Sequence, residues 1–193
     1  MLRSTSCIIV LLGTVHATAA QAPPAAQIAA ATLAAPADRR EGARVLGYDA
    51  GGRLVALREG TNDLICTTDD PKAEGFETSC YHRSLEPYMA RGRTLLQQGV
   101  TAGDERNAIR WKEAQEGRLA LPDRMAMQYI LTGRSFDATT GTVEGEYRRS
   151  VMYVPFATAE STGLSQRASA TDPWIMYPGT PGAHIMITPP RAR

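Results

Sequence analysis

The sequence lacks several features that would assign it to a structural class at once. Its 193 residues include three cysteines, three histidines and 6% aromatic residues. No apolar run approaches the roughly 20 residues that a membrane-spanning helix needs. The formal net charge is +1, so no excess of one sign favours binding to nucleic acid or to an anionic membrane. The composition therefore excludes a collagen, a coiled coil, a disordered polyampholyte and a multi-pass membrane protein.

Short catalytic and cofactor-binding motifs are also absent. The sequence has no G-x-S-x-G, P-loop, dinucleotide-binding G-x-G-x-x-G, H-E-x-x-H, EF-hand or C-x-x-C pattern. These absences favour a protein that is not an enzyme. They do not decide the matter, because carboxylate, Arg and Tyr groups that converge from distant segments need no short motif.

The first segment with a clear signature is a secretory leader at residues 1–20. Arg3 supplies a positive charge, Cys7–Leu12 form a short apolar run, and Ala17–Ala19 match an A-x-A cleavage site. We expect cleavage after residue 19 or 20. The mature protein is then predicted to be free in the periplasm of a bacterium or secreted to its exterior, without an integral membrane anchor.

Two cysteines, Cys66 and Cys80, remain in the mature chain with thirteen residues between them. In an exported protein such a pair is expected to form a disulfide. The alternatives are free buried thiols or metal ligands. A single, widely spaced pair lacks the doubled close spacing of a zinc ribbon.

The remaining chain is long enough for one domain with its own core. We expect residues 21–36 to form a linker (21–27) and a short Ala-rich helix (28–35) that Pro36 ends, and residues 37–193 to form a single domain. Residues 45–57 predict a β-hairpin, because the Gly51-Gly52 pair allows the positive φ of a tight turn.

Helical and strand periodicities follow along the chain. The apolar spacing of residues 85–98 predicts a helix with Ser84 as its cap, and residues 105–116 predict a second helix capped by Asp104. Segments 125–131 and 147–154 predict strands, and 174–177 with 184–188 predict a final hairpin. The predicted fold is therefore α+β: a mainly antiparallel sheet with two or three helices packed on one face, and one disulfide.

The final hairpin supplies one candidate ligand site. It follows the long Ser/Thr-rich connection 156–173, and loops held by a rigid scaffold commonly carry function. Hydroxyl, carboxylate, imidazole and aromatic groups gather in this part of the sequence and can line a small polar pocket. The candidate residues are Glu160, Ser161, Trp174, Tyr177 and His184. The alternative is a surface loop beside a core Trp.

Three residues supply a candidate metal site. His82 and Glu86 are four apart, and with His184 they offer two imidazoles and one carboxylate, a ligand set typical of catalytic zinc. Against this site, the predicted cap at Ser84 places His82 before the helix. No cofactor is otherwise predicted.

Two further metal hypotheses are weaker. Met125 with Met127, and His184 with Met186, each share a strand face and offer ligands for Cu(I), although such methionines usually fill a core. Carboxylates inside the predicted disulfide loop offer hard oxygen ligands for calcium, in a spacing that matches no EF-hand. Those carboxylates belong to Asp69, Asp70, Glu74 and Glu77.

The predicted helices also carry an arginine cluster. It could bind an acidic partner or a phosphate, but neighbouring glutamates are spaced to pair with it. The arginines are Arg91, Arg93, Arg106 and Arg110, and the glutamates are Glu105, Glu113 and Glu116. The leading functional hypothesis is a non-catalytic module that binds a small ligand or an envelope protein, and not nucleic acid. The alternative is a metal-assisted or acid/base hydrolase that uses His82, His184 and a carboxylate.

Overall fold

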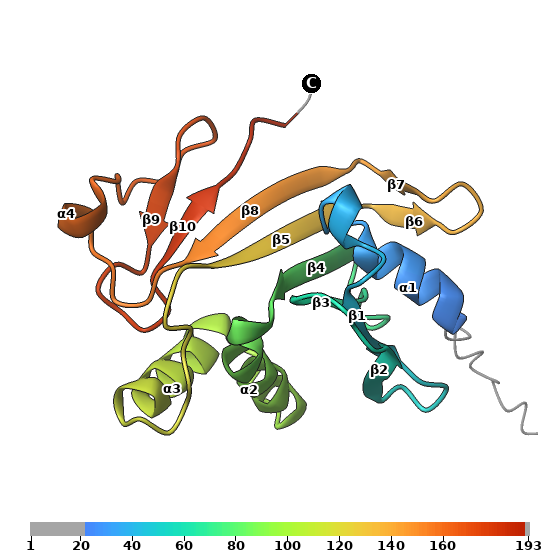
Figure 1. Cartoon of the computed structure of the whole chain (residues 1–193), viewed down its shortest axis with the longest axis horizontal. Helices are drawn as coiled ribbons and strands as arrows, with labels where there is room; N and C mark the ends of the chain where they lie inside the picture. The colour runs from blue at the N-terminus through green and yellow to red at the C-terminus, as the bar shows by residue number, and fades with distance from the viewer. Residues whose placement is uncertain (1–21, 192–193) are drawn as a thin grey trace, which may run out of the picture.

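A computed structural model describes residues 22–191, which form a large sheet with helices on both sides (Figure 1). The helices are α1 (Pro24–Thr32), α2 (Glu86–Gln97), α3 (Gly103–Gln115) and the short α4 (Ala159–Thr162), with 3-10 turns η1 (Ala37–Arg39) and η2 (Arg83–Leu85). The strands are β1 (Arg44–Tyr48), β2 (Leu54–Arg58), β3 (Leu64–Thr67), β4 (Phe76–His82), β5 (Ala126–Gly133), β6 (Ser135–Asp137), β7 (Thr142–Glu144), β8 (Tyr147–Tyr153), β9 (Trp174–Met176) and β10 (His184–Ile187).

Eight of these strands make one sheet in the order β2-β1-β3-β4-β5-β8-β10-β9, while β6 and β7 form a separate hairpin. Neighbouring strands are antiparallel, except that β1 and β3 run parallel. The predicted α+β class with a mainly antiparallel sheet is therefore confirmed. So are the hairpin β1–β2 and the final hairpin β9–β10.

The predicted disulfide is present and joins two neighbouring strands. Cys66 on β3 lies directly opposite Cys80 on β4, with an S–S bond and Cα atoms 4.0 Å apart. Both cysteines are fully buried. The bond therefore fixes β3 to β4 below the loop 68–75 that connects them.

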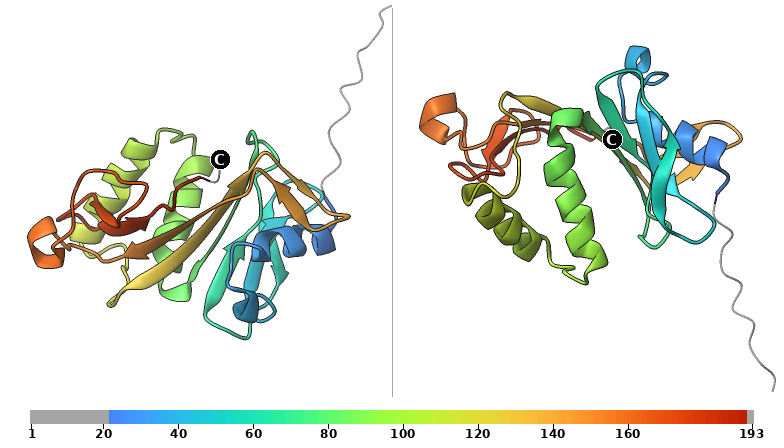
Figure 2. Two further views of the ribbon diagram at one scale, coloured as in Figure 1. Left: turned by 90° about the horizontal axis from the view of Figure 1, so that it is seen from above. Right: turned by 60° about the horizontal axis from the view of Figure 1, so that its bottom comes forward.

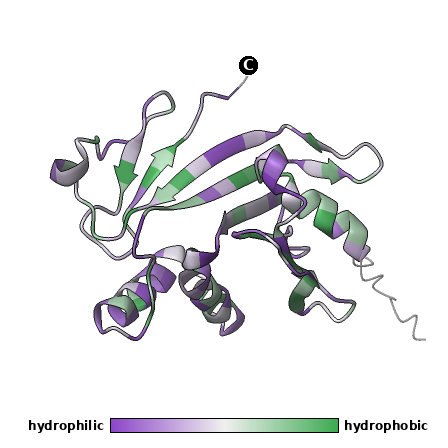
Figure 3. Cartoon of the chain, in the orientation of Figure 1, coloured by the Kyte–Doolittle hydropathy of each residue, from purple (hydrophilic) through white to green (hydrophobic). Residues whose placement is uncertain are grey.

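Helix α1 covers one face of the sheet. Ala30 and Ala31 pack there with Val45, Cys66 and Cys80 in a buried core. The helix begins at Pro24, inside the stretch predicted as a linker, because Pro is well accommodated in the first turn of a helix. Hydropathy colouring shows α1 as mainly apolar (Figure 3), which suits a helix that packs closely on a sheet.

Helices α2 and α3 lie on the opposite face, as the right-hand view of Figure 2 shows for α1 and α2 on either side of strands β1–β4. Here Tyr81 and Leu85 are buried together with Leu46 and Ile65, and Met89 of α2 packs against them. Two helices thus share one face as predicted, and α1 adds a layer on the other. No helix within residues 22–191 is long and apolar enough to cross a bilayer.

Local details differ from the sequence predictions at three points. Strand β4 occupies a stretch for which no strand was predicted. Ser84 does not cap α2 but lies in the turn η2, whose own cap is the His82 side chain that accepts a hydrogen bond from the Ser84 N–H; α2 follows with Leu85 at its N-cap. Helix α3 starts at Gly103, so Asp104 is in its first turn rather than at its cap.

Candidate functional site

A groove runs between helix α2 and the sheet face formed by β1 to β4. It consists of two adjoining cavities of about 490 and 420 Å³, each within the range of small-molecule sites. We call it the α2 groove. The residues that line both cavities are Tyr48, Leu54, Asp70, Arg93 and Leu96.

The floor of the α2 groove is largely apolar. Leu54 comes from β2, Tyr81 from β4, and Met89 and Leu96 from α2. The Leu96 side chain is 46% exposed, which makes it one of three large apolar residues on the described surface. An exposed apolar floor inside a groove is typical of a binding surface rather than of a solvated face.

The rim of the groove is acidic. Asp69, Asp70 and Glu74 project from the loop 68–75, and Glu77 follows at the start of β4. Within residues 22–191, the first three form no ion pair, and the Glu77 carboxylate lies 3.6 Å from a guanidinium nitrogen of Arg149. Three carboxylates therefore lie beside an apolar floor without an ion-pair partner within residues 22–191, and Lys72 of the same loop is the one lysine that lines the groove.

The pKa values of two groups in the groove are raised, mainly by burial and further by neighbouring carboxylates. Burial raises the pKa of Asp69 above its usual value, and the neighbouring carboxylates of Asp70 and Glu77 raise it further, against a backbone hydrogen bond that lowers it. Burial likewise raises the pKa of Tyr48, and Asp70 and Asp69 add to that rise. A positive charge placed in the groove would stabilise the ionised form of Asp69.

Arg93 lines the groove, but its charge is already neutralised. Its guanidinium donates to the Glu86 carboxylate at 2.7 Å and to the Tyr81 hydroxyl at 2.8 Å, and Tyr81 donates to Glu86 at 2.6 Å. Burial is the main reason why the pKa of Tyr81 is raised. Arg93, Glu86 and Tyr81 thus form one polar wall of the groove, and Arg93 makes no ion pair with the acidic rim.

The structure places His184 among aromatic rings rather than in a groove. Its ring lies 5.1 Å from that of Tyr153 and 5.7 Å from that of Tyr177, and its Nδ1 is 2.8 Å from the Gly182 carbonyl oxygen. Burial lowers the pKa of His184 below its usual value. Of the predicted ligand-site residues, only Tyr177 therefore packs against His184.

Trp174, Ser161 and Glu160, the other predicted ligand-site residues, have local structural positions. Trp174 is paired with Met186 on the sheet, two positions along β10 from His184. Ser161 closes a capping box with Thr158 at the start of α4, and Glu160 in that short helix is exposed. None of the three makes a hydrogen bond or ring contact with His184 within residues 22–191.

The predicted metal set is not assembled either. His82 on β4 and His184 on β10 are separated by three strand spacings, about 14 Å at the usual distance between strands. Both carboxylate oxygens of Glu86 accept hydrogen bonds from Tyr81 and Arg93. Among residues 22–191, no three His, Cys, Asp or Glu side chains lie close enough to hold a metal ion.

The register of the sheet also separates the two methionine pairs. Met127 is opposite Met152, which is opposite Ile185, so these three share one face. His184 and Met186 are the alternate residues of β10 and therefore point to the other face. His184 and Met186 therefore share a face, as expected, but it is the face opposite Met127.

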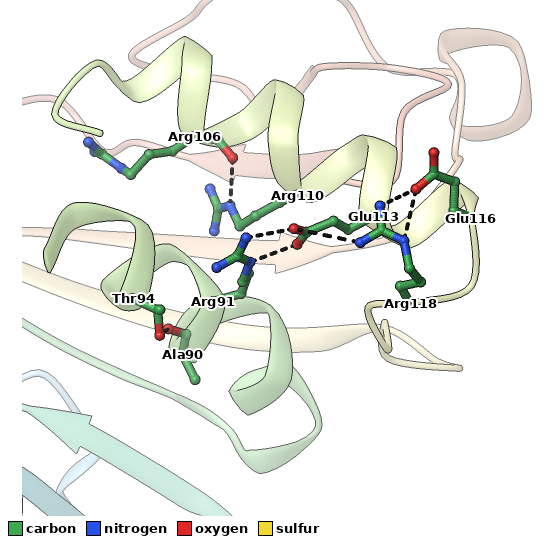
Figure 4. Close-up of polar contacts among 8 residues, drawn as sticks. All are labelled: Ala90, Arg91, Thr94, Arg106, Arg110, Glu113, Glu116 and Arg118. Atoms are coloured by element: carbon green, nitrogen blue, oxygen red, sulfur yellow. Dashed lines mark hydrogen bonds and ion pairs between the residues drawn. The ribbon is translucent and has the colours of Figure 1, made fainter. Parts of the chain in front are cut away.

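The predicted arginine cluster is occupied by contacts between and within the helices (Figure 4). Arg91 of α2 makes a bidentate pair with Glu113 of α3, at 2.6 and 2.8 Å, and Arg118 adds contacts to Glu113 and Glu116. Arg110 lies over the Tyr88 ring at 4.0 Å. These arginines fix α3 to α2 and offer no open anion site.

The α2 groove itself was only partly foreseeable. The acidic residues of loop 68–75 stand out in the sequence, but as a possible calcium loop. Their position above an apolar floor depends on β2, β4 and α2, which lie apart in the sequence and meet only in the fold.

Comparisons of the chain with protein-family models, with curated proteins and with solved structures found no match.

Proposed function

We propose that this protein is an exported, non-catalytic binding module that takes, in the α2 groove, a ligand with a positively charged group next to an apolar part. The observation that carries the proposal is the set of unpaired carboxylates of Asp69, Asp70 and Glu74 above the floor formed by Leu54, Met89 and Leu96. A cation gains charge pairing at the rim, and its apolar part gains burial on the floor.

Export is part of the same proposal. The leader predicted at residues 1–20 lies outside the described residues, so its support comes from the sequence alone. The buried Cys66–Cys80 disulfide is compatible with an oxidising compartment outside the cytosol. We infer secretion or a periplasmic location for the mature bacterial protein.

Isothermal titration calorimetry with two matched probes tests the binding proposal. Tryptamine carries an ammonium group beside an indole ring, and indole-3-propionate carries a carboxylate beside the same ring. We expect tryptamine to bind at least about tenfold more tightly, a difference of about 1.4 kcal/mol. Equal affinities, or no binding of either probe, would contradict the proposal.

A triple variant locates the effect. Asp69→Asn, Asp70→Asn and Glu74→Gln together remove three charges while keeping oxygens that can accept the loop's hydrogen bonds from the N–H groups of Glu77 and Lys72. Tryptamine affinity should fall by about tenfold or more. The matched control removes three exposed charges outside the groove (Asp38→Asn, Glu41→Gln and Glu105→Gln) and should leave the affinity within about twofold.

A further inference from the structure

A second apolar surface lies away from the α2 groove, at the end of the sheet where β5 begins and β8 ends. Segments 121–125 and 154–157 line a hollow of about 360 Å³ there. Met125 is 59% exposed and Phe156 is 51% exposed. Together with Leu96, they are the large apolar side chains exposed within residues 22–191, so two of the three belong to this one surface.

The exposed position of Phe156 is maintained against a backbone preference. Its φ is +64°, a left-handed conformation that bulky residues rarely adopt. Its N–H donates to the Thr180 carbonyl at 2.9 Å, and the Gly179 N–H donates to the Ala157 carbonyl at 2.8 Å. Such strained residues persist where the surrounding structure holds them, and they cluster at functional sites. Here the held conformation presents an aromatic ring to solvent.

The surface offers a half-exposed aromatic ring, a hollow and one charge of each sign. Phe156 lines the hollow together with Leu121, Pro122 and Pro155, and about half of its surface stays exposed. Asp123 and Arg124 are adjacent and exposed, and neither forms an ion pair within residues 22–191. In a two-fold symmetric dimer the same patch is used on both copies. If a residue of one copy contacts a second residue on the partner, the reverse contact also forms. One patch must therefore carry both members of each contact, here the ring and the hollow, and the acid and the base.

We propose that this surface is the interface of a symmetric homodimer. Phe156 of each protomer enters the hollow of its partner, and Asp123 of each protomer faces Arg124 of the other. Only two large apolar side chains are exposed there, so the association is weak and depends on concentration. It leaves both α2 grooves open, and it stands whether or not the groove binds a cation.

Sedimentation equilibrium of the chain from Gln21 onward tests the proposal over about 5 to 500 µM, the range expected for a weak interface. The average mass should rise from that of a monomer towards twice that value. Phe156→Asn should abolish this rise, because Asn tolerates the left-handed backbone and removes the apolar ring without disturbing the fold. Leu96→Ser, an equally exposed apolar residue in the α2 groove, should dimerise like the unmodified chain.

A charge exchange gives a second, independent readout. Asp123→Arg and Arg124→Asp should each weaken the dimer by several-fold, since each places like charges together. The double variant should recover the original affinity. A chain that stays monomeric at about 500 µM, the top of that range, would overturn the proposal. So would a Phe156→Asn variant that still dimerises, or a double variant no tighter than the single ones.

Discussion

Among single residues of the α2 groove, charges that are paired lie next to charges that are not. Arg93 and Glu86 neutralise each other and Tyr81 bonds to both, whereas Asp69 and Asp70 form no ion pair within residues 22–191. Paired groups contribute to stability, and under the proposed function the unpaired carboxylates above the apolar floor select the ligand. Substitutions in the two sets should therefore have different effects.

Tyr81→Phe tests the paired set. The change removes a buried hydroxyl that donates to Glu86 and accepts from Arg93, so the free energy of unfolding should fall by about 1–2 kcal/mol in a urea titration. Tyr129→Phe is the matched control, because no hydrogen bond of the Tyr129 hydroxyl occurs within residues 22–191 and the ring packs against the α1 core. It should change stability by less than about 0.5 kcal/mol.

His184 predicts a pH dependence of stability. Burial lowers the pKa of His184 in the folded protein below the ordinary value of 6.5, and the groups that contact its ring are Tyr153, Tyr177 and the Gly182 carbonyl. As the pH falls below 6.5, the unfolded chain binds a proton that the folded chain does not, so stability is present above this pH and is lost below it.

Urea titrations between pH 8 and pH 5 measure this loss. His184→Gln should flatten the pH profile relative to the unmodified chain, whatever its effect on absolute stability. His82→Gln leaves His184 in place and should keep the slope. A profile that is the same with and without His184 would show that the imidazole is not buried as described.

Among the elements, the ones that sequence periodicity predicted are those whose contacts follow a simple pattern. Leu85, Tyr88 and Met89 recur at helical spacing, and α2 buries that face against the sheet. Strand β4 escaped prediction because Glu77, Thr78 and Ser79 interrupt its apolar alternation, and the burial of Thr78 is imposed by neighbouring elements.

The faces of the sheet were harder to assign than its strands. Helix α1 is apolar all round, so its sequence does not indicate which side packs or on which face it lies. The alternation of β5 and β10 predicted pairs of residues on one face, but only the register shows that Met127 and His184 point to opposite faces. The α2 groove required both the register and the packing of α2, which no local pattern contains.

The disulfide gives a prediction for the elements around the groove. Replacing Cys66 and Cys80 together by Ala should lower the free energy of unfolding by about 3 kcal/mol, because the bond restricts a short loop in the unfolded chain. The loop 68–75 carries the acidic rim and would lose its anchor. Denaturant titration measures the first effect, and tryptamine affinity, expected to fall several-fold, measures the second. Unchanged values of both would contradict this role.

For the whole molecule, the two exposed apolar surfaces have different positions and charge. The α2 groove lies between a helix and the sheet and has an acidic rim. The surface that exposes Met125 and Phe156 lies at the end of the sheet, beside Asp123 and Arg124. The first suits a cation with an apolar part, and the second suits a copy of the same chain. A module of this kind can bind ligand and self-associate without either process blocking the other.

The most direct test of the central claim is an amide NMR titration of the uniformly ¹⁵N-labelled mature chain with tryptamine. Binding in the α2 groove predicts saturable shifts concentrated in residues 68–77 and in α2, with little change around His184 and Phe156. Shifts that are absent, that never saturate, or that centre on the aromatic rings near His184 would contradict the assignment of the groove as the ligand site.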